Sequence, residues 1–353
     1  MNWHAGAAVA ASLLVALATG NAANAEDFRF RMAGGHPPSV YYTIMMSKYF
    51  VPGFTRRMAA LGHRVTIDES WGGSLLKAPE TLEGVRDGVA ELGGFCVCLE
   101  ADTLRLNNYS LWLPFDIPDA AGAGRLGRAV HDANPALLRA YEQHGQVLLS
   151  LYPTQNFGLW TRFPWKALDD LRGRKIAGAG PAAHWLAGIG ATPVSATAPN
   201  FREALSSGIW DGMVMFPFDG IGLRLHEATS LFTVVDFGAK PIVVMTVNKA
   251  VFEALPEPVR LAMVETGREV EGLSGAWQDA ALVENMKTIG GAMPVARLGP
   301  EDKRVWATAL AGYPAEKARE AEALGLPARQ VMQFAIDEAE RRGHAWPVRY
   351  RID

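Results

Sequence analysis

The sequence predicts an α/β protein built from two similar lobes, and two observations lead to this prediction. The chain has 353 residues, and about 100–200 residues per domain is typical, which favours two domains. A β-α-β-α-β pattern occupies residues 28–99, and a shorter version of it recurs at 175–216. Alternating strands and helices form mostly parallel sheets with helices on both faces. Two such lobes leave a cleft at their junction, where ligands usually bind.

Each element of the first pattern has a local signature. Residues 28–32 alternate between apolar and charged side chains, which is typical of a strand, and residues 40–61 carry apolar side chains at helical spacing. A second alternating strand is expected at 64–68, and a helix at 79–86. The continuous apolar run at 92–99 predicts a strand that is buried on both faces.

The rest of the chain repeats this pattern and then becomes helical. Strands are expected at 147–152, 157–161, 175–177, 192–194, 212–216, 231–237 and 242–247, and helices at 182–189 and 201–207. From Glu257 to Ile289, after Pro258 at the start, the only strong helix breakers are three glycines. A continuous helix there would be roughly 50 Å long, which is long enough to contact both lobes.

The first 25 residues have the layout of an export signal. Residues 7–19 are apolar, but a membrane-spanning helix needs about 20 such residues. The run is followed by a small-x-small site that ends at Ala25, as in a cleaved signal peptide. The residues before the run include His4 but no Lys or Arg, although a signal peptide usually begins with a positive charge. A buried N-terminal helix is therefore the alternative. We expect cleavage near Ala25 and an exported chain without stable membrane insertion.

Composition excludes several classes of protein. The net charge of -3 and the lack of a block of like charges argue against nucleic acid as the main partner. Two cysteines are too few for a disulfide framework or a four-ligand zinc site, and the eight histidines have no metal-ligand spacing. No cofactor and no metal are therefore expected. Cys96 and Cys98 should lie on one face of a strand, where disulfide geometry is rare, so we expect two buried thiols.

Two short motifs could indicate an enzyme. Ser74 and Lys77 fit the S-x-x-K pattern of exported acyl enzymes, but the S-D-N and K-T-G motifs that accompany it are not in the sequence. A loop that leads into a helix is the favoured interpretation, and an enzyme that uses these two residues is the alternative. Residues 122–127 fit G-x-G-x-x-G without a preceding buried strand, which favours the start of a helix.

Aromatic side chains gather at the ends of the expected strands. About half of them should be ordinary core, and the others would line a cleft that suits a ligand with a ring or an apolar body. They are Trp71, Phe95, Phe157, Trp160, Trp185, Trp210, Phe216 and Phe218.

A series of short motifs carries a resemblance to a known family. Residues 167–176 read ALDDLRGRKI, 190–194 read GATPV, 203–208 read EALSSG and 211–212 read DG. A Gly-Gly-x-Leu loop at 72–75 precedes them. In this order and spacing the chain resembles the DctP family, the periplasmic solute-binding subunits of tripartite ATP-independent periplasmic (TRAP) transporters. The similarity extends over most of the chain after the export signal.

The resemblance implies a periplasmic binding protein-like fold. Two α/β lobes with central, mostly parallel sheets would be joined by hinge strands and crossed by one long helix. They would close around one small organic acid and deliver it to the membrane permease subunits; a partner role for a signalling receptor is an alternative. The implied lobes are residues 26–152 with 236–283, and residues 153–235 with 284–353. The chain would be free in the periplasm, because no lipobox cysteine lies near residue 25.

The chain departs from the family pattern at the positions that bind the acid. The arginine that usually pairs with the solute carboxylate falls at Ala177, and a second basic position falls at Phe157. A polar run after the DG turn is replaced by the apolar residues 213–216. We therefore expect a more apolar solute, such as an aromatic or branched monocarboxylate, because an unpaired charge in a closed cleft is costly.

The carboxylate of such a solute needs another partner. Lys77, Arg162, His184 and Lys240 are the candidate cations, and the backbone N–H groups after Gly178 are a neutral alternative. The complete set of residues expected to contact the solute is Trp71, Lys77, Phe95, Asn156, Phe157, Arg162, Ala177, Gly178, His184, Trp185, Met213, Phe216 and Lys240.

Overall fold

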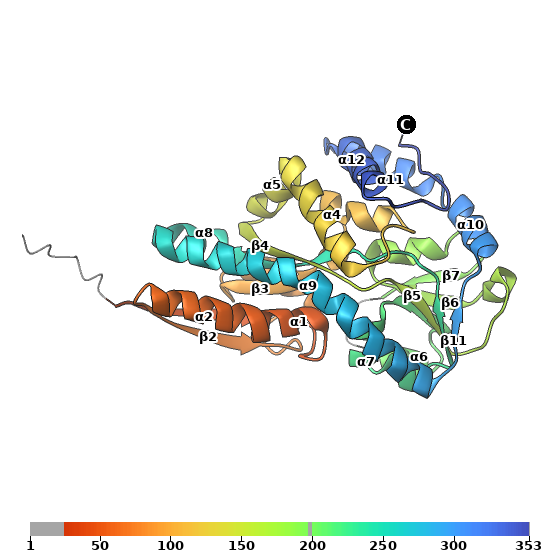
Figure 1. Cartoon of the computed structure of the whole chain (residues 1–353), viewed down its shortest axis with the longest axis horizontal. Helices are drawn as coiled ribbons and strands as arrows, with labels where there is room; N and C mark the ends of the chain where they lie inside the picture. The colour runs from red at the N-terminus through yellow and green to blue at the C-terminus, as the bar shows by residue number, and fades with distance from the viewer. Residues whose placement is uncertain (1–24, 197–199, 353) are drawn as a thin grey trace, which may run out of the picture.

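The computed structural model describes residues 25–196 and 200–352, and it contains two sheets with helices packed around each (Figure 1). This confirms the two-lobed α/β architecture. The predicted export signal lies outside the described residues, apart from Ala25. Within the described ranges, no helix has both the length and the apolar character needed to cross a membrane.

The first sheet has the strand order β2-β1-β3-β10-β4. Its strands are β1 (Asp27–Ala33), β2 (Arg64–Ser70), β3 (Leu92–Cys96), β4 (Gln146–Pro153) and β10 (Pro241–Asn248). β1 runs parallel to β2 and β3, whereas β10 runs antiparallel to β3 and β4. Every residue of β3 and β10 is buried, as expected for apolar strands covered on both faces.

Helices cover this first sheet. The helix expected at 40–61 forms as α1 (Tyr41–Met45) and α2 (Val51–Ala60), joined by a π-helical turn at Met46–Phe50. The G-x-G-x-x-G segment lies in α4 (Ala120–Ala133), where the Asp119 carboxylate caps the first turn by accepting from Gly122 N–H at 2.6 Å. The other helices here are η2 (Ala78–Glu80), α3 (Thr81–Arg86), η3 (Val97–Glu100), η4 (Arg105–Trp112), α5 (Pro135–Gln143) and α8 (Lys249–Ala254).

The second sheet has the strand order β11-β9-β5-β8-β6-β7. Its strands are β5 (Gly158–Thr161), β6 (Lys175–Gly178), β7 (Thr192–Ser195), β8 (Gly212–Met215), β9 (Leu231–Val234) and β11 (Val295–Arg297). Its short helices are η5 (Leu168–Leu171), η6 (Gly180–Leu186), α6 (Phe201–Ser206), α7 (Pro217–Gly222) and η7 (Leu225–Glu227). Both sheets are mostly parallel, as predicted, with one reversed strand each: β10 in the first sheet and β5 in the second cross over from the other lobe and run antiparallel to their neighbours.

The two crossing segments lie side by side between the lobes. Thr154 N–H donates to Lys240 O at 2.9 Å, and Phe157 N–H donates to Gly238 O at 3.2 Å. The Asn156 side chain donates to the Asp236 carboxylate at 2.8 Å and accepts from Gly238 N–H at 3.0 Å. These bonds join residues 154–157 to residues 236–240 as a pair of hinge strands.

The long helix α9 (Glu257–Ala292) has 36 residues and crosses both lobes (Figure 1). It packs against α2 and β4 of the first lobe and against α7 of the second, which confirms the prediction of one lobe-spanning helix.

Three further helices, α10 (Pro300–Ala309), α11 (Tyr313–Glu322) and α12 (Ala328–Arg341), follow β11. α11 and α12 pack on η4, and α12 also packs on α4. The C-terminal helices therefore contact helices that belong to the first lobe. The lobe boundaries drawn from the sequence, which give residues 284–353 to the second lobe, stay a prediction.

Candidate functional site

A cavity of about 60 Å³ lies where the two lobes meet, close to the hinge strands. Most of its lining is aliphatic or aromatic, and both lobes contribute. The described residues that line it are His36, Tyr42, Cys96, Cys98, Leu99, Leu111, Thr154, Phe157, Ala179, Ala182, Phe201, Val214, Met215, Phe216, Asp219, Leu223, Ile242 and Val243.

A larger hollow of about 530 Å³ lies against the hinge strands, and Phe157 lines both spaces. Its charged side chains already have partners: the Asp236 carboxylate binds Lys303 Nζ at 2.5 Å and Arg297 at 3.3 Å. The smaller cavity is therefore the better candidate for a solute site, because its polar groups are few and it is bounded mainly by apolar side chains.

Two of the polar groups that line the cavity come from the start of the chain. His36 follows β1, and its Nδ1 lies 2.9 Å from the Tyr42 hydroxyl on α1. Burial lowers the pKa of His36 to about 4, so its imidazole is neutral near pH 7. A neutral imidazole and a phenol can donate or accept hydrogen bonds, but they bring no charge to a bound anion.

Thr154 of the hinge also lines the cavity, and a carboxyl group comes from the opposite lobe. Asp219 lies on α7, and its Oδ1 accepts from the backbone N–H of Tyr41 at 3.0 Å. Burial raises the pKa of Asp219 to about 7. The same Tyr41 donates its hydroxyl to Tyr152 O at 3.0 Å and packs edge-on against Phe216 at 5.8 Å. Contacts across the lobe boundary therefore hold Asp219 at the cavity.

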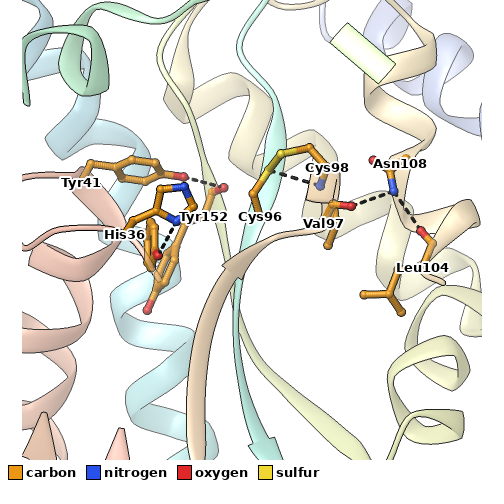
Figure 2. Close-up of a disulfide and its surroundings, with 9 residues drawn as sticks. His36, Tyr41, Cys96, Val97, Cys98, Leu104, Asn108 and Tyr152 are labelled. Atoms are coloured by element: carbon orange, nitrogen blue, oxygen red, sulfur yellow. Dashed lines mark hydrogen bonds between the residues drawn. A yellow bond between two sulfur atoms is a disulfide. The ribbon is translucent and has the colours of Figure 1, made fainter. Parts of the chain in front are cut away.

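A disulfide forms part of the cavity wall (Figure 2). Cys96 and Cys98 are joined to each other, with their Cα atoms 5.1 Å apart. The expectation of two thiols on one strand was wrong, because β3 ends at Cys96 and the chain turns into η3. The Asn108 side chain fixes this turn by donating to Val97 O and Leu104 O, both at 3.0 Å.

Several of the predicted aromatic residues meet at the cavity. Phe157 and Phe216 line it and contact each other edge-on, with ring centroids 5.2 Å apart. Trp185 packs edge-on behind Phe157 at 5.5 Å and donates its indole N–H to Leu111 O at 2.8 Å. Trp71 lies behind Tyr42 at 6.5 Å.

Five other predicted residues lie away from the described cavity lining. Phe95 is buried in β3, and Ala177, Gly178 and Met213 are buried in β6 and β8 of the second sheet. Asn156 belongs to the hinge strands, where its side chain binds Asp236 and Gly238. None of these five residues lines the cavity, whereas Val214 and Met215 of β8 do.

The four candidate cations also lie outside the described lining. Lys77 is exposed and lies 3.5 Å from Glu80, Arg162 is exposed beside Gly208, and His184 stacks on Tyr313 with ring centroids 4.1 Å apart. Lys240 is fully buried; its Nζ donates to Leu113 O at 2.7 Å and lies 3.9 Å from the Asp116 carboxylate. The cavity therefore has no lysine or arginine among its described lining residues.

Sequence reasoning missed the polar groups of the cavity. Asp219 is the only charged residue between Asp211 and Arg224, which is a usable signal for a buried functional acid. His36 stands in the Gly-Gly-His-Pro-Pro turn directly after the first expected strand, at a sheet edge where ligands bind. Among the described residues, no group of three or more His, Cys, Asp or Glu side chains could hold a metal ion.

Comparison with known proteins agrees with this architecture. A structure from Rhodoferax ferrireducens, a TRAP solute-binding protein in complex with copurified benzoate, has a TM-score of 0.80 and 18% identity, and it covers 90% of this chain and 99% of its own. A marine metagenome protein specific for aromatic acid ligands, bound to 3-hydroxybenzoate, has a TM-score of 0.79 and 21% identity over 90% of this chain and 99% of its own. A Bordetella pertussis receptor binding pyroglutamic acid has a TM-score of 0.75 and 23% identity over 87% and 99%.

The sequence itself matches a family model over most of its length. The model for DctP, the bacterial extracellular solute-binding proteins of family 7, matches residues 55–320. This range includes the first-lobe residues from α2 onward, both hinge strands and α9. The chain therefore belongs to the DctP family of bacterial extracellular solute-binding proteins.

Proposed function

We propose that this chain is the periplasmic solute receptor of a TRAP transporter. It binds one small organic acid with an aromatic or otherwise apolar body between its lobes, and it delivers that acid to the membrane permease subunits. The observation that carries the proposal is the largely apolar cavity between two hinged lobes. The ligands of two proteins with the same fold, benzoate and 3-hydroxybenzoate, support an aromatic acid.

Binding works through closure of the lobes. In the closed arrangement, Tyr41 N–H donates to Asp219, and the Ser39 hydroxyl donates to Gly222 O at 2.9 Å. A solute ring in the cavity would contact Phe157 and Phe216 on the side of the second lobe and Tyr42 on the side of the first lobe, which adds apolar contact to both lobes at once. A ring that buries roughly 150 Å² contributes about 4 kcal/mol. Only contacts that are stronger in the closed state than in the open state shift the equilibrium toward closure.

The proposed activity involves no bond making or breaking. The Ser74 hydroxyl is exposed and donates to Trp71 O at 3.0 Å, while the Lys77 ammonium faces Glu80. Activation of a serine needs a base in contact with its hydroxyl, so these contacts favour a loop over a nucleophile. Transfer of the solute to a signalling receptor would use the same cavity, and neighbouring permease genes would favour transport.

Export to the periplasm is also part of the proposal. The support is the signal-like composition of residues 1–25, together with a family described as extracellular. N-terminal sequencing of the protein recovered from the periplasm tests this: a mature chain that begins near Glu26 is the expected result. A chain that retains Met1 would contradict it.

Calorimetry against a panel of acids tests the solute class. We expect benzoate, phenylacetate or a branched monocarboxylate to bind, and succinate and malate to bind poorly because the described lining holds no cation for a second carboxylate. Ala182→Phe should fill the cavity and abolish binding, whereas Ala60→Phe on the exposed side of α2 should not. Tight binding of diacids without binding of apolar acids would refute the proposal.

A further inference from the structure

The cavity poses an electrostatic problem for an organic acid. A solute carboxylate would meet no lysine or arginine among the described lining residues, and it would meet one carboxyl group, Asp219. Two ionised carboxylates that share a dehydrated site repel each other strongly, so one of them keeps a proton. A receptor for acids with this lining needs a way to bind an anion without a cation.

The hydrogen bonds of Asp219 leave one of its oxygens available. Oδ1 accepts from Tyr41 N–H, and no described residue donates to Oδ2. The residue is 9% exposed and lines the cavity, so Oδ2 is the position from which a proton could reach a solute. A protonated carboxyl group donates one hydrogen bond and still accepts at its other oxygen.

The groups around Asp219 carry no compensating charge. Tyr41 and Tyr42 face it from α1, and His36 lines the same cavity from the preceding turn. The remaining charged groups of the elements that pack on α7 are engaged elsewhere. On α9, Glu271 pairs with Arg128 and Asp279 accepts from the N–H groups of Ala120 and Ala121; on η7, Glu227 pairs with Arg224.

We propose, building on the function proposed above, that protonated Asp219 binds the carboxylate of the solute. One proton is then shared between the two carboxyl groups, so that each monocarboxylate anion enters the closed cavity together with one proton. Asp219 thereby determines specificity: it accepts an acid plus a proton, and it selects against a second negative charge on the solute.

The alternative proton carrier is His36, and the pKa values decide between them. Burial raises the pKa of Asp219 to about 7 and lowers the pKa of His36 to about 4. Near pH 7, Asp219 is therefore readily protonated, whereas His36 stays neutral and has no proton to give as a charged donor. Above pH 7, Asp219 must regain a proton before an acid binds, so affinity falls as the pH rises, by about tenfold per unit.

Calorimetry of the mature protein with benzoate and with phenylacetate at pH 6, 7, 8 and 9 tests this proposal. Titrations in two buffers with different ionisation enthalpies give the number of protons taken up. We expect affinity to fall about tenfold from pH 8 to pH 9, with close to one proton taken up per solute at pH 9. Asp219→Asn keeps an N–H donor without a titrating group, so its affinity should stay within about twofold across this range. Asp169→Asn, at an exposed position, should behave like the parent protein.

The outcomes separate this proposal from the proposed function. Acid binding that stays constant from pH 6 to pH 9 without proton uptake would overturn the role of Asp219 and leave the acid receptor standing. Binding of benzylamine that strengthens with pH, without binding of either acid, would overturn both, because ionised Asp219 would then pair with an ammonium group. Should Asp219→Asn fail to fold in a thermal melt, proton uptake by the parent protein decides the question.

Discussion

Gly180→Ala should weaken solute binding by blocking closure of the lobes. Gly180 starts η6 in the second lobe with φ of +51°, and a Cβ built on it would lie 2.1 Å from Cys98 O in the first lobe. Ordinary contact begins near 3.4 Å, so the lobes or their loops would have to separate by more than about 1 Å. Overpacking of this kind costs about 1–3 kcal/mol, which corresponds to affinity about 5- to 150-fold weaker.

Gly173→Ala is the matched control for this experiment. Gly173 also has a positive φ, +71°, and nothing lies within 4 Å of the Cβ position. The left-handed backbone costs an alanine roughly 1–2 kcal/mol, in the open and closed states alike. Urea unfolding should therefore show a loss of stability in both variants, while calorimetry should show weaker binding only for Gly180→Ala. Equal affinities of the two variants would refute the inference that η6 meets Cys98 on closure.

Three further perturbations test the packing around the site. Replacing Cys96 and Cys98 together by Ala should lower the free energy of unfolding by about 1–2 kcal/mol, the value expected for a disulfide that closes such a short loop. Free thiols detected by a thiol assay of the native protein would contradict the disulfide. Lys240→Met leaves Asp116 buried without its cation and should cost about 3–5 kcal/mol in urea unfolding, with part recovered by adding Asp116→Asn. Phe157→Ala should cost about 3–5 kcal/mol and shift calorimetric preference toward bulkier acids; unchanged preference would mean that Phe157 does not contact the solute.

Local sequence patterns predicted the regular parts of the fold. The two sheets, most strands and the lobe-spanning α9 follow from periodicity and from the scarcity of helix breakers. The mixed strand directions could not be read in this way, because β5 and β10 acquire their directions by crossing between lobes. The disulfide was missed for a related reason: the apolar run at 92–99 has the composition of a strand, but η3 turns the second half back on the first.

The site was harder to predict because distant segments build it. Phe157 and Phe216 were found from the resemblance, because they stand at positions where it implies polar residues. His36 and Asp219 are 183 positions apart in the sequence, and only closure of the two lobes places both beside one cavity. Neither residue has a periodic signature, so tertiary structure was needed to connect them.

Lys240 is the buried cation nearest to the hinge, and its contacts there explain why it does not serve the cavity. Lys240 lies in a hinge strand, where its backbone N–H donates to the Thr154 hydroxyl and its ammonium group binds Leu113 O. Withdrawing this ammonium group to meet a solute would leave Asp116 unpaired in the interior, at a cost of about 3–5 kcal/mol. An apolar acid would recover little of that cost. The lysine is therefore committed to the hinge, and a carboxyl group that gains a proton is the less costly way to bind an acid in this cavity.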